Sequence, residues 1–334
     1  MKVFHDPRQR DHAPVRELHN GEWTPFAEVP ERLDAIVAAI GAGELPDDRG
    51  MDPILAVHNP GYLAFLQTAH DDWLAAGRTG DAIGYSFPVV RRRPLALKRV
   101  DARIGAYAMD ASSPIAAGTW QSAYWGAQAA LAATHAVLGG DRSAFALCRP
   151  PGHHCGRDYL GGYCFLNNAA IAARAAEAAG HRVAILDVDY HHGNGTQDLF
   201  YEDGGVLFAS IHADPRTDYP FFWGHADERG AGEGEGATLN LPLPRGTGWA
   251  DYAPALGTAL RAIADFGATI LVVSYGADTF AGDPISQFRI ETADYTAMGA
   301  AIAGLGLLTA IVMEGGYAVD ALGANVAAFL EGFA

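Results

Sequence analysis

From about residue 120 onward, continuous apolar runs alternate with segments of helical composition. The apolar runs are residues 143–148, 182–189, 205–212, 269–276 and 308–316. Segments 121–140 and 167–180 are rich in alanine and end in glycine, as helices commonly do. Unbroken Val/Ile/Leu runs separated by helices indicate a parallel sheet that is covered on both faces. The pattern therefore predicts an α/β fold with three layers, αβα, around a central, mostly parallel sheet.

Residues 80–118 break this pattern, because they mix Pro, Gly and a basic run at 91–93 that we interpret as solvated. A connection of this length inside a compact domain is uncommon unless it binds something, so we interpret it as a long insertion. It carries apolar and aromatic side chains that a monomer would expose: Tyr85, Phe87, Val89, Val90, Leu95, Ile104 and Tyr107. No internal repeat or linker divides the chain, and we expect residues 1–334 to form a single domain.

Polar clusters stand at or just after the predicted strands. They are the stretches 149–156, 161–168, 187–195, 276–284 and 313–317. Functional loops of parallel sheets lie beyond the carboxyl ends of the strands, so all of these stretches could meet on one rim. A single Asp or His at such a place more often caps a turn, but the coincidence of the clusters favours a functional site.

Two carboxylates and an imidazole in these clusters suit a metal ion. Asp189 and His191 are two positions apart and project to the same side of an extended chain. Asp278, after the run 269–276, would add a third ligand. This ligand set fits a divalent ion, with zinc as the default and one position left open for water.

Adjacent imidazoles at His153 and His154 offer acid–base chemistry beside that metal. One could act as general base and then as general acid, while the other could stabilise the transition state as an imidazolium. Asp187 and Asn194 are the candidates to orient them, and a carboxylate partner favours the imidazolium more than an amide does. Tyr317, which follows two glycines, could donate its phenol to the substrate carbonyl as an oxyanion stabiliser.

Charge and cysteine content narrow the partners and the compartment. The formal net charge is −16, from 23 Lys and Arg against 39 Asp and Glu, which disfavours nucleic acid and anionic membranes and favours a cationic or neutral ligand. No segment reaches ~18 uninterrupted apolar residues and the N-terminus has no apolar signal region. Three cysteines cannot all pair within one chain, so we expect a reducing cytoplasm.

Several motifs, taken in order and spacing, make a family resemblance specific. They are "RELHNGE" (16–22), "RPPGHH" (149–154), "GGYCFLNNAA" (161–170), "DVDYHHGNGTQD" (187–198) and "DTFAGDPIS" (278–286). Over roughly residues 50–330 the chain resembles the zinc-dependent histone deacetylase family, which shares the arginase-type α/β fold. Within that family the chain looks most like the bacterial acetylpolyamine amidohydrolases. The long 80–118 insertion is a further part of this resemblance.

The resemblance implies roles for individual residues. It implies zinc ligands at Asp189, His191 and Asp278, with His153 and His154 as the catalytic pair, His154 as the base and Tyr317 as the oxyanion donor. It implies a structural potassium site made by the side chains of Asp187 and Ser210 and by the backbone carbonyls of Asp189, His191 and Ile211. It places substrate contacts at Gly162, Tyr163 and Tyr219, and acidic groups at the mouth at Glu17 and Asp101. A further acidic position of the family is Ser112 here.

The resemblance also implies a homodimer paired through residues 80–118 and a small cationic amide, such as an acetylated polyamine, as the substrate. An acetyl-lysine protein deacylase with the same catalytic residues is the alternative. A non-catalytic metal sensor on the same fold would have no need for Tyr317. An arginase-like manganese hydrolase would need more bridging carboxylates than these motifs supply.

Overall fold

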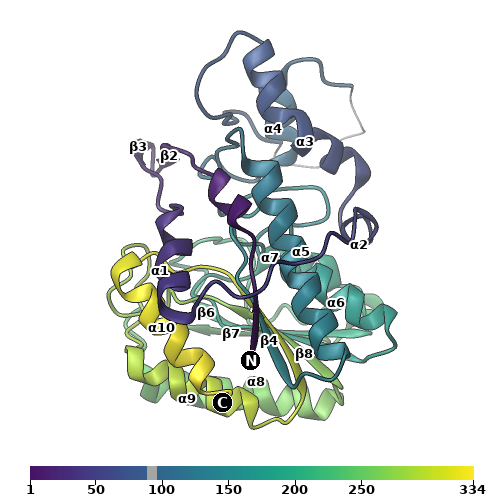
Figure 1. The fold of residues 1–334 in the computed structure, drawn as a ribbon, viewed down its shortest axis with the longest axis vertical. Coiled ribbons are helices and arrows are strands. Elements are labelled where there is room, and N and C mark those ends of the chain that lie inside the picture. Colours follow the sequence, from purple (N-terminus) through teal and green to yellow (C-terminus); the bar gives the residue numbers. More distant parts are fainter. Residues whose placement is uncertain (89–95) are drawn as a thin grey trace.

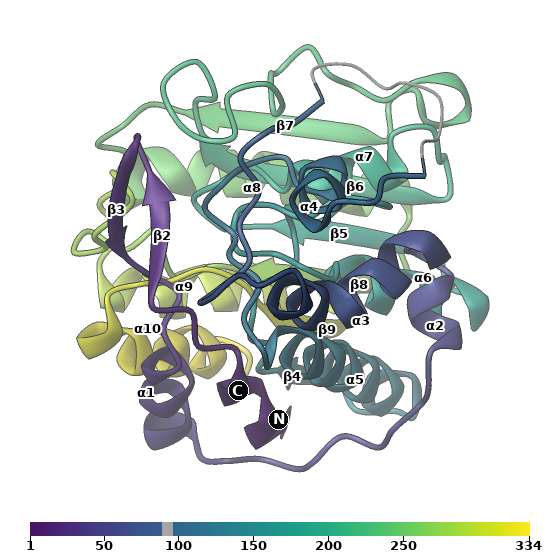
Figure 2. The same ribbon diagram turned by 90° about the horizontal axis from the view of Figure 1, so that it is seen from above.

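The computed structural model describes residues 1–88 and 96–334, and a seven-stranded sheet forms its centre (Figure 1). All neighbouring strands are parallel, so the predicted α/β fold with a central parallel sheet is confirmed. Figure 2 shows the strand order from β4 at the bottom to β7 at the top. In spatial order the strands are β1 (Lys2–Phe4), β4 (Ser143–Ala146), β9 (Leu308–Met313), β8 (Ile270–Tyr275), β5 (Val183–Asp187), β6 (Val206–Ala213) and β7 (Thr238–Leu243).

The central strands are apolar on both faces because helices cover both faces. In β5, Val183 and Ile185 pack into one hydrophobic cluster, whereas Ala184 and Leu186 pack into the cluster on the opposite face. Fully burying an aliphatic side chain of this size stabilises the fold by about 1.5–3 kcal/mol. An unbroken apolar run is therefore the expected sequence of such a strand.

Two groups of helices make the outer layers. One face is covered by α5 (Thr119–Leu138), α6 (Asn168–Ala178) and α7 (Asn194–Phe200). The other face is covered by α1 (Glu31–Ile40), α8 (Trp249–Phe266), α9 (Thr292–Ala303) and α10 (Val319–Glu331). No helix in the described ranges is long and apolar enough to cross a membrane.

Further elements stand above the sheet in Figure 1, with α3 and α4 at the top. They are the hairpin of β2 (Arg16–His19) and β3 (Glu22–Pro25), the short α2 (Asp52–Leu55), and the packed pair α3 (Pro60–Ala75) and α4 (Val100–Tyr107). The helix α4 lies within the 80–118 insertion, so part of this segment is regular structure.

The insertion buries more of its own apolar surface than its sequence indicates. Ile104 is only 2% exposed, and Phe87 and Tyr107 pack against the same cluster, with the Tyr107 ring stacked on Phe65 at 4.8 Å. The expectation that a monomer would expose these residues was wrong, because α4 presents its apolar face to α3. Tyr85 is 73% exposed, as expected. Val89, Val90, Leu95 and the basic run 91–93 lie outside the described residues.

Candidate active site

The loops that follow the carboxyl ends of β4, β5, β8 and β9 bring the predicted polar clusters together. Asp187, at the end of β5, is the register partner of Ser210 on β6 and of Ser274 on β8. Side chains that are far apart in the sequence therefore meet along one edge of the sheet, as expected for a parallel α/β fold.

Asp189, His191 and Asp278 offer ligand atoms that all lie within 4.8 Å of one another. The Nδ1 atom of His191 lies 2.9 Å from Asp278 Oδ2. Two backbone amides hold the carboxylates, since Gly315 N donates to Asp189 Oδ2 and Tyr190 N donates to Asp278 Oδ1, both at 2.9 Å. A side chain at position 315 would not fit, because a Cβ there would lie 2.6 Å from Asp189 Oδ2.

The charge balance of this cluster fits a divalent cation. Asp187, Asp189 and Asp278 are fully buried, and within the described ranges none of them forms an ion pair with a lysine or arginine. Burial, and then the charge of Asp189, raise the pKa of Asp278 to about 7. Buried carboxylates crowded in this way favour a bound cation, and their oxygens with one imidazole nitrogen are ligands that zinc accepts.

The two adjacent histidines have different partners. His153 Nδ1 lies 3.0 Å from Asp187 Oδ2, whereas His154 Nδ1 lies 2.7 Å from Asn194 Oδ1. Their ring centroids are 4.0 Å apart, and both side chains are almost fully buried. The structure therefore brings together each histidine and the orienting partner expected from the sequence.

This difference separates the pKa values of the pair. Burial opposes protonation of His153, but the carboxylates of Asp189 and Asp187 outweigh it and raise its pKa to about 10. Burial lowers the pKa of His154 well below its usual value, and the neighbouring His153 cation adds to this effect. At neutral pH, His154 is therefore an imidazole that can accept a proton, while His153 is a cation.

Tyr317 closes the site from the end of β9. Its ring lies 5.6 Å from the ring of Tyr163 and 4.9 Å from the guanidinium carbon of Arg32. Arg32 donates to the backbone carbonyls of Gly316 and Glu314, both at 2.6 Å. Burial raises the pKa of Tyr317 well above its usual value, so its hydroxyl remains a proton donor at neutral pH.

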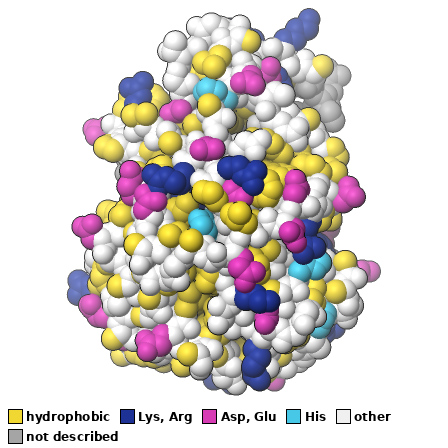
Figure 3. Space-filling view, viewed as in Figure 1, with side chains coloured by type: hydrophobic (Ala, Val, Ile, Leu, Met, Phe, Trp, Pro, Cys, Tyr) yellow, Lys and Arg dark blue, Asp and Glu magenta, His cyan; other side chains and the backbone are white. Residues whose placement is uncertain are grey.

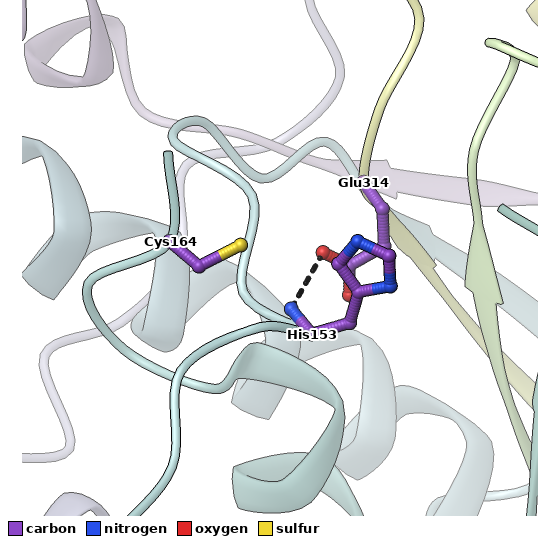
Figure 4. Close-up of side chains that lie close together, drawn as sticks. All are labelled: His153, Cys164 and Glu314. Carbon is purple, nitrogen blue, oxygen red and sulfur yellow. Dashed lines mark hydrogen bonds between the residues drawn. The ribbon is translucent and has the colours of Figure 1, made fainter. Parts of the chain in front are cut away.

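Glu314 was not predicted as a site residue, yet its carboxylate supports the histidine pair. Its Oε2 accepts hydrogen bonds from the amides of Gly152 (2.6 Å) and His153 (3.1 Å), and its Oε1 accepts one from Ser274. Figure 4 shows the carboxylate turned toward the His153 amide. The signal available in the sequence was a glutamate inside "MEGGY", directly after an apolar strand.

Glu314, His153 and Cys164 also place potential ligand atoms within 4.8 Å of one another (Figure 4). Each of the three already has protein partners, because His153 Nδ1 contacts Asp187 and the Cys164 thiol donates to the Gly162 carbonyl at 3.3 Å. This group therefore fits a supporting role better than a metal site.

Aromatic rings line the approach to the metal ligands. The Tyr219 ring lies 5.1 Å from the His154 ring at 86°, and Tyr163 donates from its hydroxyl to Glu17 at 2.9 Å. Gly162 has a φ of 52°, and a Cβ there would lie 2.2 Å from the His154 ring. Only glycine fits this position without displacing the histidine.

The acidic residues near these aromatic rings differ in whether their carboxylate oxygens already have hydrogen-bond partners. Glu17 is 3% exposed, and its Oε2 atom has no hydrogen-bond partner among the described residues. Burial raises the pKa of Glu17 to about 7. Asp110, which was not predicted, has an Oδ2 that accepts hydrogen bonds from Gly162 N (2.7 Å) and from the Tyr219 hydroxyl (2.8 Å), and its Oδ1 accepts one from Ser112 N.

Asp101 differs from Glu17 because basic side chains already pair with its carboxylate. It lies on α4, where Arg99 and Arg78 approach its Oδ2 at 2.7 and 3.0 Å. The hydrogen bond from Arg99, with backbone and Coulomb contributions, lowers its pKa to about 2. A carboxylate that is neutralised by two guanidinium groups has little charge left for a substrate cation, so the geometry does not support the role expected for Asp101.

The expected potassium ligands also lie close together. Asp187 and Ser210 are side by side on β5 and β6, and Ile211 follows on β6. Ser210 Oγ contacts His212 Nδ1 at 2.8 Å. In the parts of the chain that the structure describes, the backbone carbonyls of Asp189 and His191 accept no hydrogen bond from another backbone amide. The site remains a prediction.

The fold and this constellation define an α/β enzyme with an acid–base pair beside a candidate metal triad. Residues 26–333 match the histone deacetylase domain, and the chain belongs to that family. It is 50% identical to acetylpolyamine amidohydrolase 2 of Pseudomonas aeruginosa over 339 residues. The matched region covers 100% of this chain and 98% of that protein. It is 47% identical to the acetylpolyamine amidohydrolase of Mycoplana ramosa, with 95% of each covered. The crystal structure of acetylpolyamine aminohydrolase from Burkholderia pseudomallei superposes with a TM-score of 0.95 at 44% identity, over 100% of this chain and 98% of that one.

Proposed function

We propose that the protein hydrolyses the amide bond of acetylated polyamines, or of similar small cationic amides, and releases acetate. The observation that carries this proposal is the split histidine pair beside the Asp189, His191 and Asp278 triad, with Tyr317 facing it. The acetylpolyamine amidohydrolases at about half identity over the whole chain support the substrate class.

Zinc is the metal that this site would hold, through Asp189, His191 and Asp278. When bound, zinc supplies Lewis-acid polarisation of the amide carbonyl and favours deprotonation of water at neutral pH. An Asp278→Ala variant would keep only two ligands and should lose zinc and activity together. Unchanged metal content in the folded variant would contradict the ligand assignment.

The chain's own groups perform the proton chemistry. His154, neutral and oriented by Asn194, accepts a proton from the attacking water and later gives it to the departing amine. His153, held as a cation by Asp187, stabilises negative charge that develops on the reacting carbon's oxygens. The Tyr317 hydroxyl donates a hydrogen bond to the carbonyl oxygen as it becomes an oxyanion.

The rim selects a thin cationic amide in this proposal. Tyr163 and Tyr219 form aromatic walls for the methylene chain of the amine, and Glu17 offers an unpaired carboxylate oxygen to a distal ammonium group. An acetyl-lysine protein deacylase is the second candidate, because the same catalytic groups would serve it. Turnover of acetylputrescine, acetylspermidine and an acetyl-lysine peptide by the zinc-loaded enzyme decides between them, and equal turnover of the peptide would favour the deacylase.

We propose two further properties. The exposed Tyr85 and helix α4 of the insertion, which stands at the top of Figure 1, fit a homodimer whose paired insertions would roof each active site. The three cysteines are buried and unpaired, which fits the cytoplasm.

A further inference from the structure

The backbone of Tyr317 is held by an aspartate that belongs to a different loop. Asp283 Oδ2 accepts hydrogen bonds from Tyr317 N at 2.7 Å and from Ala318 N at 3.2 Å. Its other oxygen accepts one from Ile285 N at 3.1 Å within its own loop. Asp283 is 7% exposed, and hydrogen bonds to a shielded, ionised carboxylate are among the stronger ones in proteins.

The loop that carries Asp283 is the loop that carries the metal ligand Asp278. It begins after β8 and runs beside the segment that follows β9. Ala277 N donates to the Gly315 carbonyl at 2.9 Å, and Glu314 N donates to the Tyr275 carbonyl at 2.8 Å. The two loops are thus joined by backbone hydrogen bonds on the strand side and by Asp283 at Tyr317.

Tyr317 needs such an anchor because the chain before it is flexible by composition. Two glycines precede it, and Gly316 has a φ of 126°, which side chains rarely adopt. Arg32 binds the carbonyls of Gly316 and Glu314 but none of the atoms of Tyr317 by hydrogen bonds. Among the described residues the Tyr317 hydroxyl has no hydrogen-bond partner, so the ring's position depends on packing and on the Asp283 contact.

We infer that Asp283 is a positioning residue that holds the Tyr317 hydroxyl at the distance from the metal triad that the reaction needs. The loop after β8 then has two roles: it supplies Asp278 to the metal and sets the place of the oxyanion donor. This inference rests on the function proposed above for Tyr317. An oxyanion donor acts over a narrow range of distance, and misplacement by about 1 Å can cost about 10²-fold in rate.

A double-mutant cycle tests the inference with the full-length, zinc-loaded enzyme and acetylputrescine. Asp283→Ala should lower kcat by about 10- to 100-fold with KM changed less than about twofold, and with zinc content unchanged. Tyr317→Phe should lower kcat by about 10²–10³-fold. In the Tyr317→Phe background, Asp283→Ala should cost less than about twofold, because the hydroxyl that it positions is absent.

Asp283→Asn keeps one acceptor oxygen and should lose less activity than Asp283→Ala, and it replaces the alanine variant if that one unfolds. Asp203→Ala is the control: its carboxylate also accepts a backbone hydrogen bond, from Gly205 at 2.8 Å, and pairs with Arg174 at 2.6 Å, but it precedes β6 and so lies at the amino ends of the strands, away from the site. Wild-type kcat is expected for the control.

Equal costs of Asp283→Ala in both backgrounds, unchanged turnover in the single variant, or loss of zinc from both Asp283 variants would overturn the inference. Full turnover by Tyr317→Phe would instead overturn the role proposed for Tyr317 and remove the basis of the inference. Absence of any turnover of acetylputrescine by the wild type would count against the proposed function itself.

Discussion

At the scale of single residues, two neighbouring histidines differ in the charge of the group that each of them contacts. His153 faces a carboxylate and His154 faces an amide oxygen at similar distances, 3.0 and 2.7 Å. The partner's charge therefore decides which imidazole is a cation and which is free to accept a proton. In the proposed mechanism, the cation stabilises negative charge and the neutral imidazole transfers the proton.

Changing that partner should shift the pH profile. In Asn194→Asp a carboxylate would face His154 and raise its pKa, so His154 would become protonated, and lose its function as a base, at a higher pH than in the wild type. We expect the acidic limb of kcat against pH to move to higher pH, measured between pH 5 and 9. An unmoved acidic limb in a folded, zinc-loaded variant would contradict the role of His154 as the base.

Glu17 should make substrate binding depend on pH. Its pKa is raised to about 7 by burial, so the carboxylate is about one tenth ionised at pH 6 and about nine tenths at pH 8. KM for acetylputrescine should therefore fall several-fold as pH rises through this window. An uncharged N-alkylacetamide and a Glu17→Gln variant serve as controls, and both should show a flat KM; a fall in either would exclude Glu17 as the cause.

The residues that sequence reasoning found differ in kind from those it missed. Asp189, His191, His153 and His154 stand in dense motifs whose chemistry is readable from residue type and spacing. Glu314, Asp110 and Asp283 act by accepting backbone hydrogen bonds from other loops. Such contacts depend on where the loops meet, and no spacing along the chain encodes that.

At the scale of elements, a buried ionic group joins helix α1 to the loop after β4. Glu28 Oε1 lies 2.6 Å from Arg32 Nη1 and 2.8 Å from Arg149 Nε, and all three side chains are at most 2% exposed. Arg149 donates in addition to the backbone carbonyls of Gln9 and His12, both at 2.7 Å. One carboxylate thus joins the N-terminal segments to the loop after β4.

Removing that carboxylate should destabilise the fold. Glu28→Gln would leave two guanidinium groups buried without a counter-charge, and breaking a buried pair in this way costs about 3–5 kcal/mol. Thermal and urea unfolding would measure the loss. Glu31→Gln, at an exposed position three residues further on, is the control and should stay within about 0.5 kcal/mol of the wild type. Similar values for the two variants would show that the ionic group contributes little.

The strands that were predicted from the sequence are continuously apolar, whereas the strands that were missed are not. The runs that became β4, β5, β6, β8 and β9 are buried on both faces and therefore continuously apolar. By contrast, β7 is an edge strand that alternates buried and half-buried residues and contains Pro242, and β1 has three residues. Edge position and short length remove the periodic signal on which the prediction relied.

At the scale of the whole molecule, charge is mixed on the face that Figure 3 shows. Figure 3 shows acidic, basic and apolar side chains intermixed over one face instead of a single charged patch. The net charge of −16 favours the approach of cations over long distances, whereas Glu17 is the local contact that we propose.

Assembly is the prediction that belongs to this scale. Light scattering at micromolar concentration should report a dimer, and replacing exposed Tyr85 by Asp should shift it toward the monomer if the insertion forms the interface. Tyr201→Asp, at a half-buried position near β6, tests whether any added charge has the same effect. A wild type that is monomeric and fully active on small amides would contradict the paired roof.

The strand order has a consequence for how the protein is made. The ribosome completes β5 long before β8, yet β8 lies directly beside β5 in the finished sheet. A nascent chain that has just emerged past His191 therefore offers Asp189 and His191 without Asp278, which is too few ligands to retain zinc. Tyr317 arrives later still. For the zinc site proposed above, metal capture must therefore wait until Asp278 has emerged from the ribosome, long after Asp189 and His191.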